Sequence, residues 1–375
     1  MGKPRLPDVE KQEMLDLPML LLTLLLTALG LVMIYSSSFA RALYESGDSA
    51  YYFKRQGIFD LVGTAAMLAI SRVRPELIRK MAFPVLGVSI LFLILVFVPG
   101  IGRAENGATR WVSLGISFQP SEVAKLGVIL SFAAMITRFG EKMETFRWGI
   151  APFAGILAVI VVLLRLEPHN SAIVIIACTA GAMLFLGGVK YRWFILGGCA
   201  MLLGLAFILG AGGYEASRIT AWQDPFSDPT DDGYQIIQSL YAIGSGGLFG
   251  LGFGQGRQKY LYLPEEHNDY IFSIACEELG LVGAAAILLL YALLILRGYW
   301  ISMHIRDQFL SLTVAGITTL TALQVFFNIG VVTNLLPSTG ISLPFFSYGG
   351  TALLIQLGEM GIILGASRQC SAGFL

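Results

Sequence analysis

Long apolar runs separated by short polar stretches occupy most of this 375-residue chain. The clearest runs are 17–35, 85–98, 123–136, 154–166, 173–186 and 284–296. The runs are unbroken rather than alternating, which favours helices over strands. In hydrocarbon every backbone N–H and C=O needs a partner within a helix or a closed barrel. We therefore predict an all-α polytopic membrane protein.

The pattern predicts about ten transmembrane helices in a single domain, 1–375, because about 20 apolar residues cross a bilayer. The expected spans are 15–37, 57–71, 80–99, 120–138, 149–166, 170–188, 192–212, 269–297, 308–334 and 345–367. Two connecting segments exceed a simple turn, 100–119 and 213–268, and the second joins the seventh and eighth spans. Long ordered loops commonly carry binding functions.

Charge adds an orientation to this topology. Hydrophobic residues make up 55% of the chain, charged residues 13%, and the formal net charge is zero, which gives no electrostatic case for nucleic acid. Lys3, Arg5 and Lys11 precede the first span and place the N-terminus in the cytoplasm by the positive-inside rule. Ten spans then predict cytoplasmic tails at 1–14 and 368–375 and an extracellular loop at 213–268. The first run is too long for a signal-peptide core.

The cysteines and two of the histidines carry no predicted chemistry. Their spacing suggests neither a disulfide nor a zinc site, so the cysteines are expected to be packing residues. The residues concerned are Cys178, Cys199, Cys276, Cys370, His169 and His304.

Glu122 and Lys125 open the fourth span and lie three residues apart, so they share a helix face and can pair. Pro120 suits the first helical position. One interpretation is a structural ion pair that sets helix register; the other is a pair that lines a polar cavity. A buried pair adds little stability by itself, which favours the cavity.

Asp269 stands where the eighth span begins, with apolar residues after it. A carboxylate at this boundary suits a general base acting on a membrane-anchored substrate. Asp is also a favoured helix N-cap, and position alone does not separate the two interpretations. Glu277 and Glu278 follow within the span and are expected to pair or to cap within the bundle.

Basic residues accompany aromatic residues before the second span and in the 100–119 segment. Lys54 and Arg55 follow Tyr51-Tyr52-Phe53, and Arg110 precedes Trp111. Such residues form ordinary interfacial belts, and they can also bind phosphate. Both interpretations stay open from the residues alone.

Five segments, in order, resemble the SEDS family of bacterial cell-wall polymerases, which includes RodA, FtsW and SpoVE. They are NGATRW at 106–111, FQPSEVAKL at 118–126, GYQIIQSLYAIGSGGLFGLGFGQG at 233–256, LPEEHNDYIFSIACEELGLVG at 263–283 and NIGVVTNLLPSTGISLPFFSYGGTALL at 328–354. The KRQ at 54–56 and the Gly-rich stretch look closer to the FtsW/SpoVE branch than to RodA.

The resemblance implies a peptidoglycan glycosyltransferase that polymerises lipid II at the outer face of the bacterial cytoplasmic membrane. It also implies membrane lipid as surroundings, a class B penicillin-binding protein as partner, and a role in division, elongation or sporulation. A lipid II flippase and a non-catalytic scaffold are the alternatives. Candidate charges clustered toward the outside favour the polymerase over the flippase.

The resemblance also assigns roles to residues. It makes Asp269 the essential acid, and it matches Glu122, Lys125 and Arg55 to residues of the family pattern. Further candidates for the substrate cavity are Lys54, Arg110, His267 and Ser347. The expected reaction is a single inverting displacement with Asp269 as base, while basic residues or a divalent cation (Mg²⁺ or Mn²⁺) balance the leaving pyrophosphate.

One segment departs from the family pattern. Many members carry Gln-Pro-Asp where this chain has Glu167-Pro168-His169, so no role is carried over to His169.

The eighth and ninth spans are the predicted contact for the partner's transmembrane helix, because small residues permit close helix approach in lipid. The small residues are Gly280, Gly283, Ala284, Ala285, Ala286, Ala315 and Gly316. Packing of these residues within the bundle is nearly as well supported.

Overall fold

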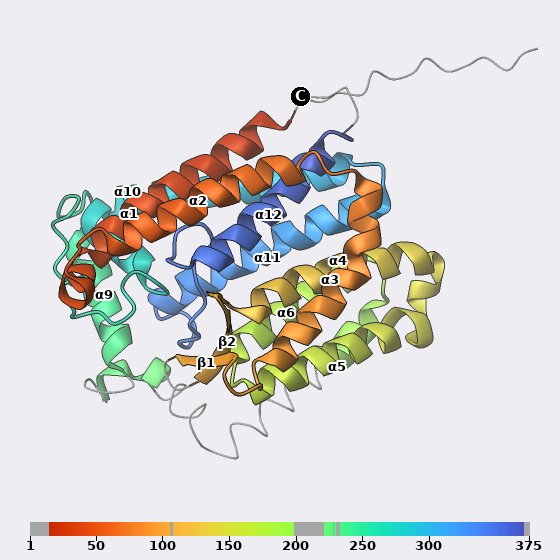
Figure 1. The fold of residues 1–375 in the computed structure, drawn as a ribbon, viewed down its shortest axis with the longest axis horizontal. Coiled ribbons are helices and arrows are strands. Elements are labelled where there is room, and N and C mark those ends of the chain that lie inside the picture. Colours follow the sequence, from red (N-terminus) through yellow and green to blue (C-terminus); the bar gives the residue numbers. More distant parts are fainter. Residues whose placement is uncertain (1–14, 106–107, 199–220, 228, 230–232, 371–375) are drawn as a thin grey trace, which may run out of the picture.

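The computed structural model describes residues 15–105, 108–198, 221–227, 229 and 233–370 as a helical bundle (Figure 1). The helices are α1 (Leu17–Ser46), α2 (Tyr51–Ile70), α3 (Pro75–Leu95), α4 (Pro120–Phe139), α5 (Ala151–Leu166), α6 (Asn170–Leu186), α9 (Tyr234–Gly246), α10 (Ile271–His304), α11 (Gln308–Val332) and α12 (Gly350–Ser367). Short helical turns occupy Gly140–Glu144, Phe146–Ile150 and Pro225–Ser227.

The helical class of the fold is confirmed. Seven helical segments of the described chain are long and apolar enough to cross a membrane, and α6, an apolar helix of 17 residues, is shorter. The predicted seventh span lies mostly outside the described residues, although 191–198 is helical. The expected total of ten spans therefore stays a prediction, as do the tails at 1–14 and 371–375.

Helix α11 lies in the middle of the bundle, where it contacts α4, α6, α10 and α12 (Figure 1). Helices α2 and α12 pack together, as do α3 and α4. Ala315 is buried on α11, and a Cβ on Gly316 would lie 2.8 Å from the Ile129 side chain. The α11 half of the predicted partner surface is therefore wrong, because these small residues pack against neighbouring helices.

The 100–119 segment forms a sheet that the all-helical prediction did not include. Strands β1 (Gly102–Glu105), β2 (Ala108–Leu114) and β3 (Ile116–Phe118) pair antiparallel in that order. Val112 pairs with Phe118 across β2 and β3, immediately before α4 begins. The sheet thus sets where the chain enters α4.

Several predicted boundaries are corrected. Helix α1 runs to Ser46 rather than 37, and α12 begins at Gly350 rather than 345. Helix α2 begins at Tyr51 rather than 57, because its first turn is polar and aromatic and gave no apolar signal. The 213–268 segment contains α9, so it is not a simple loop; residues 213–220, 228 and 230–232 lie outside the described part.

Asp16 fixes the first turn of α1. Its carboxylate accepts a hydrogen bond from Met19 N at 2.9 Å, which caps the helix. The same carboxylate pairs with Arg297 of α10 at 2.6 Å, and the Arg297 guanidinium stacks over Trp300. A charged pair beside Trp is typical of a membrane–water interface.

Candidate functional site

Asp269 lies two residues before α10 begins. The N-cap position is Tyr270, and no side chain caps this helix end. The interpretation of Asp269 as an N-cap is therefore wrong. The Asp269 residue is half-buried at the start of α10.

The backbone around Asp269 is held by α11 and by the segment before α12. Asn328 of α11 donates hydrogen bonds to Asp269 O and to Ile341 O, each at 2.7 Å. Ser347 Oγ donates to Asn268 O at 2.8 Å. These bonds join three parts of the chain that are distant in sequence. The main chain that carries the carboxylate is therefore fixed in place.

Gly340 leaves room beside the Asp269 carboxylate. A Cβ at Gly340 would lie 3.1 Å from Asp269 Oδ2, and its φ of +65° favours glycine. The backbone at Gly340 thus lies next to the carboxylate.

Glu266 and His267 attach the same segment to α1 and α2. The guanidinium of Arg41 in α1 donates two hydrogen bonds of 2.7 Å to the Glu266 carboxylate. Burial opposes ionisation, but pairing with His267 and Arg41 holds the pKa of Glu266 below its usual range. The buried His267 ring packs against Tyr52 of α2 and against Tyr348, with centroids 4.5 and 5.6 Å away. His267 therefore occupies a packing position two residues before Asp269, and its role at the substrate stays a prediction.

Lys54 and Arg55 lie in the first turns of α2, not in a loop before it. Lys54 Nζ pairs with Asp48 at 2.8 Å on the surface, and this contact lowers the pKa of Asp48. An exposed pair contributes little stability and exchanges readily for another anion. Because Tyr52 of the same helix touches His267, both cations lie at the end of the bundle that holds Asp269.

The predicted pair on α4 is confirmed. Lys125 Nζ and Glu122 Oε1 are 2.7 Å apart, and only 5% and 10% of the two side chains are exposed. Pro120 occupies the first helical position, as expected. Glu359 of α12 is buried within electrostatic reach of both residues. A second buried acid therefore lies within electrostatic range of the lysine.

Arg110 lies at the junction of α5 and α6. Its Nη2 donates to Pro168 O at 2.6 Å, and His169 Nε2 lies 3.4 Å from Gln119 Nε2. Neither oxygen of the buried Glu167 has a hydrogen-bond partner among the described residues. Burial raises the pKa of Glu167 to about 8 and lowers that of His169 to about 3.

Several residues of this end of the bundle carried no clear sequence signal. Glu167 and His169 were left without a role, although a polar tetrapeptide between two apolar runs was a usable hint. Arg41, Asn328 and Glu359 were missed because each has its partner far away in the sequence.

The divalent cation stays a prediction. Within the described chain, no three His, Cys, Asp or Glu side chains gather closely enough to hold a metal ion. An apolar groove of about 520 Å³ beside Leu21, Leu293 and Trp300 lies next to the Arg297–Asp16 pair, far along α10 from Asp269. Its lining offers no acid for catalysis.

The sequence is similar to proteins of bacterial cell-wall synthesis. A family model described as "Cell cycle protein" (FTSW_RODA_SPOVE) matches residues 16–372. The "Probable peptidoglycan glycosyltransferase FtsW" of Geobacter metallireducens is 40% identical over 364 residues, covering 96% of this chain and 97% of that protein. "Stage V sporulation protein E" of Bacillus subtilis is 40% identical over 354 residues, with 94% and 97% covered.

Solved structures share the fold. A chain of the structure titled "Structural coordination of polymerization and crosslinking by a peptidoglycan synthase complex" matches with a TM-score of 0.79 and 27% identity, covering 95% of this chain and 98% of that chain. The rod shape determining protein RodA of Thermus thermophilus matches with a TM-score of 0.70 and 28% identity, covering 95% and 97%.

Proposed function

The chain belongs to the FtsW, RodA and SpoVE family of cell cycle proteins, and we propose on this premise that it is a peptidoglycan glycosyltransferase with Asp269 as its general base. The observation that carries the assignment is the fixation of Asp269. Asn328 and Ser347 hold its backbone, while the side chain is half-buried and caps no helix. A catalytic base needs this combination of fixed position and access.

The proposed reaction joins two lipid II units. Asp269 takes the proton from the acceptor 4-hydroxyl while that oxygen attacks the anomeric carbon of the donor. The bond from this carbon to the lipid pyrophosphate breaks, and the pyrophosphate leaves with the bonding electron pair. One displacement inverts the anomeric centre, so one essential carboxylate suffices, unlike the paired acids of glycosidases.

Basic residues would balance the charge of the leaving pyrophosphate. Lys54 and Arg55 lie at the solvent-exposed start of α2, at the end of the bundle that holds Asp269. Arg110 approaches from β2 beside Pro168. Guanidinium groups bind phosphate oxygens through paired hydrogen bonds, which suits both arginines to this role. Glu122 and Lys125 shape the polar interior next to α12.

Location and partner follow from the same proposal. The chain is a multi-pass membrane protein, and we place the Asp269 end at the outer face of the cytoplasmic membrane, with both termini in the cytoplasm. A class B penicillin-binding protein would dock on α10, where Ala285 and Ala286 are exposed. Gly283 is a poor probe of this contact, because a Cβ there would lie 2.2 Å from the Leu279 side chain.

Polymerisation of labelled lipid II by the purified chain tests the function. Asp269→Asn should abolish glycan synthesis while the variant still folds and binds its partner. Asp224→Asn, which changes an exposed carboxylate with no role in the proposed site, is the matched control and should stay active. Substantial polymerisation by Asp269→Asn would exclude Asp269 as the base.

Detergent solution separates the polymerase from a flippase, because transport needs a bilayer and polymerisation does not. Glycan synthesis in detergent supports the polymerase. If the chain makes no glycan in detergent with or without its partner, yet moves lipid II across vesicles, the transferase proposal is wrong.

A further inference from the structure

An apolar, glycine-rich segment follows α9 and lies against α10. Residues 244–256 read GSGGLFGLGFGQG and contain no charge. Four large apolar side chains of this segment are exposed: Leu248, Phe249, Leu251 and Phe253. Phe249 is 80% exposed, which is unusual for phenylalanine in any protein surrounded by water alone.

The segment is bonded to α10 at a break in that helix. Gly280 has non-helical φ and ψ of 68° and −170°. Across this break, Leu281 N donates to Gly247 O at 2.9 Å, and Val282 N donates to Leu248 O at 3.1 Å. A Cβ on Gly280 would lie 2.2 Å from Gly250 N. The apolar segment is therefore fixed at the height of the break.

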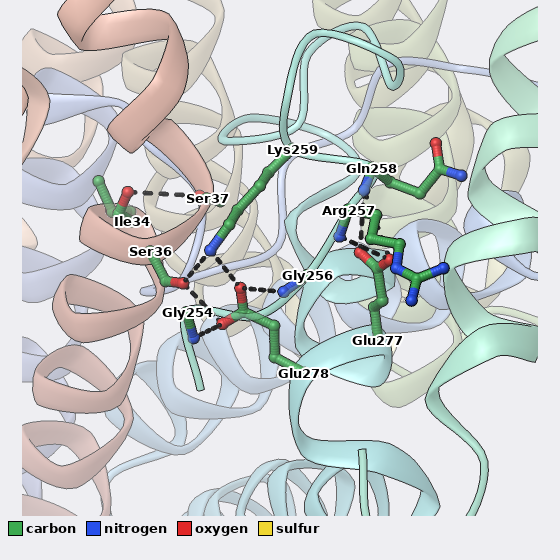
Figure 2. Close-up of polar contacts among 10 residues, drawn as sticks. All are labelled: Ile34, Ser36, Ser37, Gly254, Gly256, Arg257, Gln258, Lys259, Glu277 and Glu278. Atoms are coloured by element: carbon green, nitrogen blue, oxygen red, sulfur yellow. Dashed lines mark hydrogen bonds and ion pairs between the residues drawn. The ribbon is translucent and has the colours of Figure 1, made fainter. Parts of the chain in front are cut away.

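Glu277 and Glu278 complete this attachment, which confirms that their partners lie within the bundle. Glu277 accepts from Arg257 N at 2.9 Å, and Glu278 accepts from Gly254 N at 3.0 Å (Figure 2). The backbone N–H groups of an irregular segment are thus satisfied by carboxylates of the helix beside it. Irregular backbone is tolerated at membrane depth only when its polar groups find such internal partners.

The charge of Glu278 is balanced inside the protein. Lys259 Nζ lies 2.7 Å from Glu278 Oε1, and Ser36 of α1 donates to Glu278 Oε2 at 2.6 Å (Figure 2). All three side chains are buried. The cluster therefore links the segment to both α1 and α10, and the charges of Lys259 and Glu278 are themselves buried.

Helix geometry gives the depth of the segment in the membrane. The Arg297–Asp16 pair with Trp300 marks one interface. At about 1.5 Å per residue, Gly280 lies about 26 Å along the axis from Arg297. The hydrocarbon core is about 30 Å thick, so Gly280 lies inside the core, close to the interface on the other side of the membrane. Leu281 and Val282 next to it are exposed, as lipid-facing residues are.

We propose that residues 248–253 insert into this edge of the bilayer and that their occupant is lipid. The segment lies at the same depth in the membrane as Leu281 and Val282, and like them it exposes apolar side chains. It carries no charge that would keep it in water. Because Glu277 and Glu278 tie the same segment to the start of α10, this anchor would also fix the height of Asp269 above the bilayer. The proposal depends on the membrane-spanning bundle, not on the transferase reaction.

Depth-resolved fluorescence tests the anchor. An environment-sensitive fluorescent amino acid is encoded at position 249, and the purified full chain is reconstituted without a partner into phosphatidylglycerol–phosphatidylethanolamine vesicles. Tyr44 is the matched control, since it is also 80% exposed but lies about 42 Å along α1 from Asp16, beyond the hydrocarbon core. Lipids brominated on the acyl chain should quench position 249 several-fold more than position 44, and aqueous iodide should do the reverse.

The proposal would be overturned if iodide quenched both positions equally and brominated lipid did not quench position 249. The exposed apolar surface would then be a contact for a protein partner instead of lipid. Phe253 replaces Phe249 as the probe position if the first variant does not fold. Ser36→Ala, which removes a hydrogen bond to Glu278, should increase iodide access at 249. An unchanged profile in Ser36→Ala would show that the Glu278 cluster does not hold the segment.

Discussion

The ion pair on α4 supports a quantitative prediction, because one cation, Lys125, interacts with two acids, Glu122 and Glu359. Lys125→Met would leave Glu122 and Glu359 both buried without this cation, whereas Glu122→Gln would leave Lys125 within electrostatic range of Glu359. Removing one partner of a buried pair costs about 3–5 kcal/mol. We expect a loss of that size in Lys125→Met. Glu122→Gln should lose only about 1–3 kcal/mol, since the lysine keeps an acid.

Reversible unfolding in mixed micelles measures these free energies. The double variant Glu122→Gln/Lys125→Met should lose less than the sum of the single variants, by at least about 1 kcal/mol, as contacting residues do. Lys190→Met is the matched control: it breaks a pair with Glu144 of the same 2.7 Å length whose side chains are 46% and 58% exposed. That control should cost less than about 1 kcal/mol.

Two results would refute the reasoning about this pair. Additive single variants would mean that the two residues are not coupled. A larger loss in Glu122→Gln than in Lys125→Met would mean that Glu359 does not serve as the second partner of the lysine.

Three further changes probe the site and its supports. Asn328→Ala removes the hydrogen bond to Asp269 O, so the rate of polymerisation should fall at least tenfold. The free energy of unfolding should fall by only about 1–3 kcal/mol. Gly30→Val should lower the melting temperature of the chain, since a Cβ there would lie 2.2 Å from Phe345 O. Burial raises the pKa of Glu167 to about 8, so the stability that its protonation gives at low pH is lost as pH rises toward 8. Glu167→Gln should therefore melt higher than the parent at pH 9 and close to it at pH 5.

Each of these has a control. Gly57→Ala should be tolerated, because the atom nearest to its new Cβ is 3.9 Å away. An Asn328→Ala variant with full activity would show that the position of Asp269 does not depend on this amide. An equal difference between Glu167→Gln and the parent at pH 5 and pH 9 would mean that Glu167 has the same pKa in the folded and unfolded chain.

The sequence alone determined the class of fold and the local pairings. Apolar runs of helical length need lipid around them, so the bounds of α4 and α5 were predicted to within two residues and those of α3 to within five. Glu122 and Lys125 were paired correctly because helix periodicity brings residues three apart onto one face. The ordered motifs identified the family, which the comparisons confirmed.

The tertiary structure decided which apolar surfaces meet protein and which polar groups meet each other. Lipid tails and packed side chains are equally apolar, so hydropathy did not distinguish the buried α11 from the lipid-facing part of α10. Contacts such as Arg41 with Glu266 and Lys259 with Ser36 join residues more than 200 positions apart. No local spacing specifies such a partner, because the choice depends on how whole helices pack; the height and surroundings of Asp269 follow from those contacts.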